Sequence, residues 1–336
     1  MTAASDSKCQ PEEVGYLRHL TITVLCVSCV IGSVANGLVL WMTVFRMPRT
    51  VTTVWFLNLA LADFAVLLSL PFSIYILIVG EWPFHRWVCK LYQAFLNLTF
   101  FTSICLLVLI SVDRCISVLY PIWTRNHRTV RRAKWLAASV WLLAALTCVP
   151  YLIFRTTGAQ KNCTYCYFNF SVENGALEAT LTLEQVALGG RVAMTVTHLL
   201  LGFLLPLVVI GICAHLIRAN FQQQGWIRVN WMKRLLLMLV TTFFVCWFPF
   251  TVALCVQLWR FVKSRDTIDP QMLLFLWAAF SLGCLNSCLN PFLYVLTGRD
   301  FKKKFLQSIP SALARAFGEE DVLSQQVSKV EDAGKR

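Results

Sequence analysis

The sequence predicts an all-α membrane protein, a seven-transmembrane helix bundle with a short amphipathic eighth helix. Of the 336 residues, 57% are apolar and 14% are charged, whereas soluble domains carry roughly 25% charged residues. Seven apolar runs approach or exceed the ~20 residues that a helix needs to cross a ~30 Å hydrocarbon core. They lie at about 20–45, 54–79, 88–119, 135–154, 192–217, 235–260 and 271–296.

These runs divide the chain into four parts. An extracellular N-terminal tail at 1–18 precedes the membrane domain at 19–298, and an amphipathic interfacial helix at 299–310 leads into a cytoplasmic tail at 311–336. The interfacial helix is predicted because Phe301, Phe305 and Ile309 share one helical face beside Lys302–Lys304. The tail is polar and the first run is of full length, so we expect that run to act as the insertion signal.

Charge sets the predicted orientation. The loops that would share a side with Arg114 are rich in lysine and arginine, and their acids are Asp113 and Asp300. The positive-inside rule places this side in the cytoplasm and the N-terminus outside, as in a multi-pass protein of the plasma membrane. The net charge of +13 therefore favours membrane lipid and a cytoplasmic partner over nucleic acid.

Polar groups and prolines distinguish the runs in order. The first run carries Asn36 and the second carries Asp63 near mid-membrane. An intramembrane acid is costly without a partner, which makes it a functional-site hypothesis. The third run opens at Cys89 and closes at Asp113–Arg114, so its two ends differ chemically. Pro249 in the sixth run frees a backbone carbonyl and permits a kink.

The predicted outer side holds four of the fourteen cysteines, namely Cys9, Cys89, Cys163 and Cys166. In an oxidising compartment four cysteines permit two bridges with three possible pairings. The other cysteines fall within or beside the runs, where they are expected to pack as small apolar residues. Asn162 and Asn169 begin two accessible N-glycosylation sequons in the long outer loop at about 155–190.

Together the markers resemble the rhodopsin-type G-protein-coupled receptors. They are Asn36, Leu61-Ala62-Asp63, Asp113-Arg114-Cys115, Trp141, Pro206, Cys246-Trp247-Phe248-Pro249 and Asn290-Pro291-Phe292-Leu293-Tyr294, one set per helix. The stretches FRMPRTVTT, SVDRCISVLYP, NHRTV and FRTTG are similar to the chemoattractant receptors related to the formyl-peptide receptors. LLGFLLPL and NPFLYVLTGRDF extend the resemblance to the resolvin and lipoxin branch of that group.

The resemblance implies a role for each matching position. G-protein coupling is implied for Asp113, Arg114, Ile122, Asn290, Pro291 and Tyr294. An activation switch is implied for Ile104, Pro206, Phe243 and Trp247, and a sodium pocket for Asp63, Ser103, Asn286, Ser287 and Asn290. No cofactor other than that allosteric sodium ion is expected. The resemblance also pairs Cys89 with Cys166, which leaves Cys9 and Cys163 as a second bridge or as free thiols.

Ligand contacts follow from the same resemblance. Formyl-peptide receptors use an acid and two arginines, and the aligned positions here are Asn97, Met194 and His198. We therefore expect an apolar pocket above Trp247. The cations expected nearer its rim are Lys90, Arg155, Arg191 and Arg260. Such a pocket suits a small lipid ligand with a carboxylate, such as a resolvin or lipoxin.

The expected partners are a heterotrimeric G protein of the inhibitory class and arrestin. Ala214 stands where relatives place a tyrosine that supports the active state, so a weakly coupled or scavenging receptor is an alternative. A receptor for a peptide chemoattractant is another. A seven-helix enzyme or transporter is not expected, because the histidines are scattered and the chain shows no internal repeat.

Overall fold

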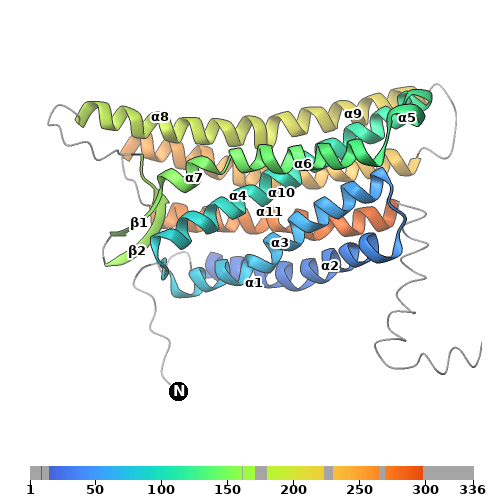
Figure 1. Cartoon of the computed structure of the whole chain (residues 1–336). Helices are drawn as coiled ribbons and strands as arrows, with labels where there is room; N and C mark the ends of the chain where they lie inside the picture. The colour runs from blue at the N-terminus through green and yellow to red at the C-terminus, as the bar shows by residue number, and fades with distance from the viewer. Residues whose placement is uncertain are drawn as a thin grey trace, which may run out of the picture.

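Seven helical spans make up the fold, as the sequence predicts. The computed structural model describes Cys9 and residues 15–160, 162–170, 180–222, 230–264 and 269–297. Within these ranges, 7 helical segments are long and apolar enough to cross a membrane. They run roughly parallel to one another as one bundle (Figure 1). The predicted interfacial helix at 299–310, the tail at 311–336 and most of the tail at 1–18 lie outside the described residues.

The spans and their connections follow in chain order. The first span comprises α1 (Gly15–Val27), a π-helical turn (Ser28–Gly32), α2 (Ser33–Trp41) and a second such turn (Met42–Arg46). The second and third are α3 (Val51–Val79) and α4 (Arg86–Leu119), followed by the short α5 (Pro121–His127). The fourth comprises α6 (Val130–Leu146) and α7 (Val149–Phe154), and leads into β1 (Arg155–Gln160) and β2 (Cys163–Phe168). The fifth joins α8 (Thr180–Leu199) to α9 (Leu205–Gln222) through a π-helical turn (Leu200–Leu204), and the last two are α10 (Asn230–Ser264) and α11 (Pro270–Thr297).

Local sequence explains where helix α3 begins and ends. The Thr50 hydroxyl accepts from the Thr53 amide at 3.2 Å, and the Thr53 hydroxyl accepts from the Thr50 amide at 2.8 Å. This reciprocal capping box satisfies two amide groups that a helix start leaves unpaired. The helix stops at Gly80, whose φ of 84° is a left-handed conformation that glycine adopts without a steric penalty.

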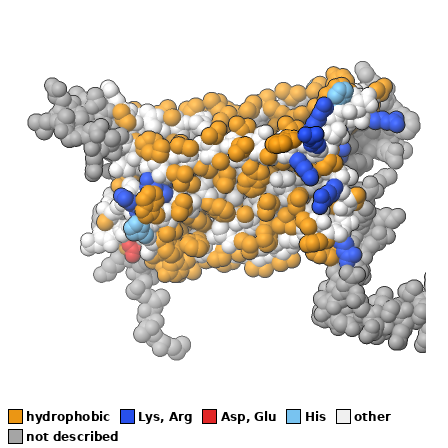
Figure 2. Space-filling model, in the orientation of Figure 1, with side chains coloured by type: hydrophobic (Ala, Val, Ile, Leu, Met, Phe, Trp, Pro, Cys, Tyr) orange, Lys and Arg blue, Asp and Glu red, His pale blue; other side chains and the backbone are white. Residues whose placement is uncertain are grey.

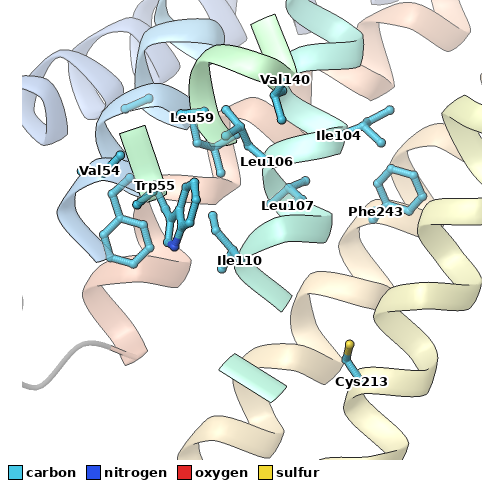
Figure 3. Packing of buried hydrophobic residues seen from close by; sticks show 14 of the residues in the cluster. Val54, Trp55, Leu59, Ile104, Leu106, Leu107, Ile110, Val140, Cys213 and Phe243 are labelled. Atoms are coloured by element: carbon cyan, nitrogen blue, oxygen red, sulfur yellow. The ribbon is translucent and has the colours of Figure 1, made fainter. Parts of the chain in front are cut away.

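Helix α4 lies at the centre of the bundle. Its apolar stretch is 61% buried, against 17–50% for the other spans. Ile104, Leu107 and Ile110 of α4 join Phe243 of α10 in the largest apolar cluster (Figure 3). The outer surface between the two ends of the bundle is dominated by apolar side chains, and Lys and Arg gather at the end that carries α5 (Figure 2). This distribution matches a membrane belt with a basic cytoplasmic end.

An antiparallel hairpin of β1 and β2 covers the opposite end (Figure 1). The sequence predicted a loop here and no strands. A disulfide joins Cys166 of β2 to Cys89 of α4, and a second joins Cys163 to Cys9. The structure thus has the first pairing that the resemblance implied, and it resolves the open question of Cys9 and Cys163 in favour of a bridge.

The hairpin is also hydrogen-bonded to the loop after α3. The amide of Trp82 donates to the Thr164 carbonyl at 2.7 Å, and the amide of Thr164 donates to a Glu81 carboxylate oxygen at 2.9 Å. Asn162 is exposed in the turn of the hairpin with a φ of 65°, and Asn169 is exposed just after β2. Both predicted glycosylation sites are therefore accessible, and their modification stays a prediction.

Candidate functional site: an outer cavity and a cytoplasmic switch

A cavity of about 220 Å³ lies between the outer halves of the helices, beneath the hairpin. Helices α3, α4, α7, α8, α10 and α11 and the hairpin all contribute to its wall. Aromatic side chains make up much of the lining, including Phe100, Tyr151, Phe168, Trp247 and Phe250. A concave, mostly apolar space with a few polar groups is the usual form of a small-molecule site.

Six of the eight residues expected to contact a ligand line this cavity: Asn97, Arg155, Arg191, Met194, His198 and Trp247. The other two do not. Lys90 instead donates from Nζ to the carbonyl oxygens of Leu152 and Ile153, at 2.7 and 2.8 Å, at the end of α7. Arg260 forms an ion pair with Asp269 at 3.0 Å. Neither Lys90 nor Arg260 is part of the cavity wall, because protein acceptors engage both cations, and the acceptor of Arg260 is an acid that itself lines the cavity. A ligand contact by either cation stays a prediction.

His198 is one of the positions that align with the charged peptide contacts of formyl-peptide receptors, and its surroundings are largely aromatic. His198 stacks on Phe100, with ring centroids 5.6 Å apart, and meets Phe101 edge-on at 5.3 Å. Its two ring nitrogens lie 3.4 Å from the Met194 carbonyl oxygen and 3.5 Å from the Tyr151 hydroxyl. These contacts hold the imidazole within an aromatic wall of the cavity.

Asn97 is buried, and its amide nitrogen donates to the Thr147 hydroxyl at 2.8 Å, toward α6. The Asn97 carbonyl oxygen is buried and has no hydrogen-bond partner. An unpartnered buried acceptor is costly, so this oxygen is an unsatisfied polar group in a residue that lines the cavity.

Two arginines mark the hairpin end of the cavity. Arg155 donates from Nη1 to the Cys166 carbonyl at 3.2 Å, and its guanidinium lies 4.0 Å from the Phe168 ring centroid. Arg191 donates to the Phe168 carbonyl at 3.3 Å and lies 4.1 Å from the Phe261 ring centroid. Burial lowers the pKa of Arg155 to about 10, with nearby Arg191 acting in the same direction. Arg155 therefore stays a cation at neutral pH.

The lining also contains two acids, Glu81 and Asp269, which no sequence motif predicted. Both have protein donors. Glu81 accepts from the Thr164 amide, and Asp269 both pairs with Arg260 and accepts from the Met272 amide at 3.1 Å. No motif marks either residue, because each owes its place to a loop that only the folded chain brings to the cavity.

Trp247 forms part of the inner wall of the cavity. Its indole meets Phe100 edge-on, with centroids 4.5 Å apart. A β-carbon at Gly283 would lie 2.6 and 2.7 Å from Cζ3 and Cη2 of that indole, so α11 needs glycine there to let the ring approach. Ile104 and Phe243 are packed in the central cluster (Figure 3), and Pro206 is buried on α9. The residues expected to form a packing switch thus lie within the bundle core.

A polar cluster surrounds Asp63 in the middle of the bundle. The carboxylate is fully buried and accepts from the hydroxyls of Ser103 and Ser287, both at 2.9 Å, and from the Asn290 amide at 2.8 Å. The structure thereby gathers four of the five residues of the expected sodium pocket. Asn286 is buried, but it is not among the described hydrogen-bond partners of Asp63.

The cytoplasmic end shows an arrangement that the sequence did not predict. Asp113 accepts from Nε and Nη2 of Arg128, at 2.8 and 2.9 Å, rather than from its neighbour Arg114. Nη2 of Arg114 donates to the Thr52 hydroxyl at 2.7 Å, and Nη2 of Arg128 donates to the same oxygen at 2.9 Å. Thr52 thus holds both arginines. Its role was hidden in the sequence because a threonine near a helix start reads as a capping residue.

The other cytoplasmic candidates differ in exposure. Ile122 on α5 is a large apolar side chain that is 80% exposed at the end where basic residues gather. Asn290 and Pro291 are buried in α11. The backbone of Tyr294 continues that helix, and its side chain lies outside the described residues.

Comparisons with known proteins agree with this geometry. Residues 35–294 match the family model described as 7 transmembrane receptor (rhodopsin family). The human "Probable G-protein coupled receptor 32" is 57% identical over 320 residues, covering 95% of this chain and 89% of that protein. The human "N-formyl peptide receptor 2" is 41% identical over 318 residues (92% and 89%), and the mouse "Formyl peptide receptor 2" is 37% identical over 305 residues (90% and 86%).

These matches confirm the predicted class and the location in the plasma membrane as a multi-pass protein. The family is one of receptors rather than enzymes, and membership implies a G-protein partner and a small ligand. The chain therefore belongs to the rhodopsin family of seven-transmembrane receptors, in the group of G-protein-coupled receptors that contains the formyl peptide receptors and G-protein coupled receptor 32.

Proposed function

We propose that this receptor responds to a lipid mediator of inflammation of the resolvin or lipoxin type. The observation that carries the proposal is the division of the cavity into an aromatic interior and one cationic end. Phe100, Trp247 and Phe250 supply apolar surface, while Arg155 and Arg191 lie under the hairpin. An amphiphile with a long hydrocarbon body and a carboxylate matches both parts.

Formyl peptides fit this cavity less well. One relative is named an N-formyl peptide receptor, and receptors of that kind are expected to use an acid and two arginines in the pocket. Here Asn97 and Met194 occupy two of those positions, and His198 in the third is enclosed by Phe100 and Phe101. The charges that would orient a formylated peptide are missing from two positions, so we expect at most weak responses to formyl peptides.

The cytoplasmic end supports the proposed output through a G protein. Arg114 lies at the end of α4, and Ile122 presents an exposed apolar side chain on α5. An apolar contact of this kind can enter a pocket on a partner. The inhibitory class rests on the resemblance to chemoattractant receptors. Arrestin is the second partner that we propose for this end.

We further propose that an allosteric sodium ion binds at Asp63. The carboxylate is buried, and no lysine or arginine among the described residues forms an ion pair with it. The carbonyl oxygen of Asn290 is buried and has no hydrogen-bond partner. Oxygen donors from Asp63, Ser103, Ser287 and Asn290 are the type that a hard cation prefers, so the residues fit the ion.

The test is ligand-dependent G-protein dissociation in cells that express the receptor. Resolvins, lipoxins, formyl peptides and other chemoattractant peptides are applied in parallel, and cells with Arg114→Ala at matched surface expression serve as the control. We expect a response to lipid that is lost in the variant. A formyl-peptide response without a lipid response would contradict the proposed ligand class, as would a response to another chemoattractant peptide alone.

A weakly coupled or scavenging receptor is the second candidate, and Ala214 favours it. This residue packs against the central cluster on α9 and lacks the hydroxyl that a tyrosine would place there. Lipid uptake or binding without G-protein activation would support this alternative. In that case Ala214→Tyr is expected to restore part of the signal.

A further inference from the structure

One buried donor at the hairpin end of the cavity has no hydrogen-bond partner. Nε of Arg155 is shielded from solvent and forms no hydrogen bond, although Nη1 of the same guanidinium donates to the Cys166 carbonyl. The central carbon of the guanidinium lies 4.0 Å from the Phe168 ring centroid and 5.8 Å from the Tyr151 ring centroid. A fixed cation with an unused donor edge is costly unless a ligand completes it.

The surroundings of Arg155 favour an anion. Among the described residues, no carboxylate forms an ion pair with Arg155. The two acids that line the cavity accept bonds from other protein donors, Glu81 from Thr164 and Asp269 from Arg260 and Met272. Arg191 adds a second positive charge near enough to disfavour the protonated state of Arg155, whose pKa of about 10 still keeps it charged at pH 7. A bound carboxylate would relieve the repulsion between the two cations.

The position of Arg155 in the fold also favours a ligand contact. Arg155 begins β1 directly after α7, and the Cys89–Cys166 disulfide ties the facing strand to α4. The guanidinium therefore lies on a strand that is fixed to the bundle. From this point the aromatic lining leads inward through Phe100 to Trp247. A carboxylate at Arg155 would place the attached hydrocarbon chain along these rings.

We propose that the Nε edge of Arg155 binds the free carboxylate of a long-chain fatty-acid ligand, which enters with its hydrocarbon body directed toward Trp247. The inference rests on the proposed lipid function and adds the ligand's orientation and the group that recognises it. A guanidinium that presents Nε–H and one Nη–H side by side matches the two oxygens of a carboxylate.

The test is a cycle of two ligands and several receptor variants. Binding of a long-chain polyunsaturated hydroxy acid and of its methyl ester is measured on membranes without added G protein. The receptors are the unmodified protein, Arg155→Gln, Arg155→Lys and Lys263→Gln. Lys263 is an exposed cation over Trp259 at the same end of the bundle and is absent from the cavity wall, so its variant is the matched control.

We expect the unmodified receptor and Lys263→Gln to prefer the acid to the ester by about tenfold or more, as an Arg–carboxylate contact implies. Arg155→Gln should reduce this ratio to about one by weakening only the acid. Arg155→Lys keeps the charge and lacks the Nε–H donor, so it should lower the ratio by about threefold or more. If Arg155→Gln does not reach the cell surface, the Arg155→Lys variant alone serves as the test.

Three results would overturn the inference. An unchanged acid-to-ester ratio in the Arg155 variants would show that another group recognises the carboxylate. An equal loss of acid and ester would show that Arg155 acts only by supporting the hairpin. Failure of both ligands to bind the unmodified receptor would remove the proposed lipid function together with this inference, whereas the first two results leave that function standing.

Discussion

Replacing Thr52 with valine removes a hydroxyl that accepts hydrogen bonds from two cytoplasmic arginines at once. Valine keeps the branched shape of threonine, and the capping box of α3 uses Thr50 and Thr53 rather than this residue. The substitution therefore acts on Arg114 and Arg128 with little change in the helix. If Arg114 must leave Thr52 to meet the G protein, the variant should favour the signalling state.

The magnitude follows from the contacts that are lost. A hydrogen bond to a charged group contributes about 1.5–3 kcal/mol. Arg128 keeps both of its bonds to Asp113 and is partly exposed, so its loss is small. The Arg114 bond at 2.7 Å is the main loss, and we use the lower value of about 1.5 kcal/mol. This shifts the equilibrium about tenfold, so an active population of about 1% would rise to about 10%.

The assay is ligand-independent G-protein dissociation at matched surface expression. Thr52→Ser is the control, because serine retains the hydroxyl that accepts both bonds. We expect raised basal signalling in Thr52→Val and basal signalling close to that of the unmodified receptor in Thr52→Ser. Equal basal signals in both variants, with agonist responses intact, would refute the idea that the Thr52 bond restrains Arg114.

Three further substitutions test other parts of the structure. Gly283→Ala should destabilise the receptor by about 1–3 kcal/mol through overpacking against Trp247, read as a lower unfolding temperature of purified protein; Gly211→Ala, whose added carbon meets nothing within 4 Å, is the control. An equal midpoint for the two variants would contradict the close packing. Asp63→Asn should abolish the dependence of agonist affinity on sodium, measured against choline at constant ionic strength; a dependence that persists would place the ion elsewhere. Ile122→Ala should reduce G-protein activation while leaving ligand affinity and surface expression unchanged, because the side chain is 80% exposed; full activation would exclude Ile122 from the contact.

The helical spans, and the polar and proline-containing motifs that mark each of them, could be recognised in the sequence. Length and hydropathy define a span because the bilayer requires a continuous apolar helix. The cost of an acid within the membrane marked Asp63 as a candidate, and the family resemblance supplied its neighbours Ser103, Asn286, Ser287 and Asn290. Of these, Ser103, Ser287 and Asn290 donate hydrogen bonds to Asp63.

Features that depend on how the connecting segments fold could not be predicted from the sequence. The first strand of the hairpin, RTTGAQ, has no alternating apolar pattern, and the hairpin is held in place by two disulfides of β2 and by hydrogen bonds to the neighbouring loop. Lys90 and Arg260 were expected at the rim because charge at a helix end is visible in the sequence, while the acceptors that engage them are not. The sequence also could not show that Asp113 pairs with Arg128 rather than with Arg114. Both arginines are near Asp113 in the sequence, and only the folded geometry selects between them.

The roof of the cavity has a kinetic consequence. The hairpin is bonded to α4 through Cys166 and to Cys9 through Cys163, and its backbone is hydrogen-bonded to Trp82. A roof attached at several points cannot swing aside as a single hinged flap. If a ligand leaves through this end, local side-chain rearrangements must let it pass, so we expect a long residence time. We expect signalling to outlast removal of the ligand from the medium, with a duration determined by the receptor rather than by the supply of mediator.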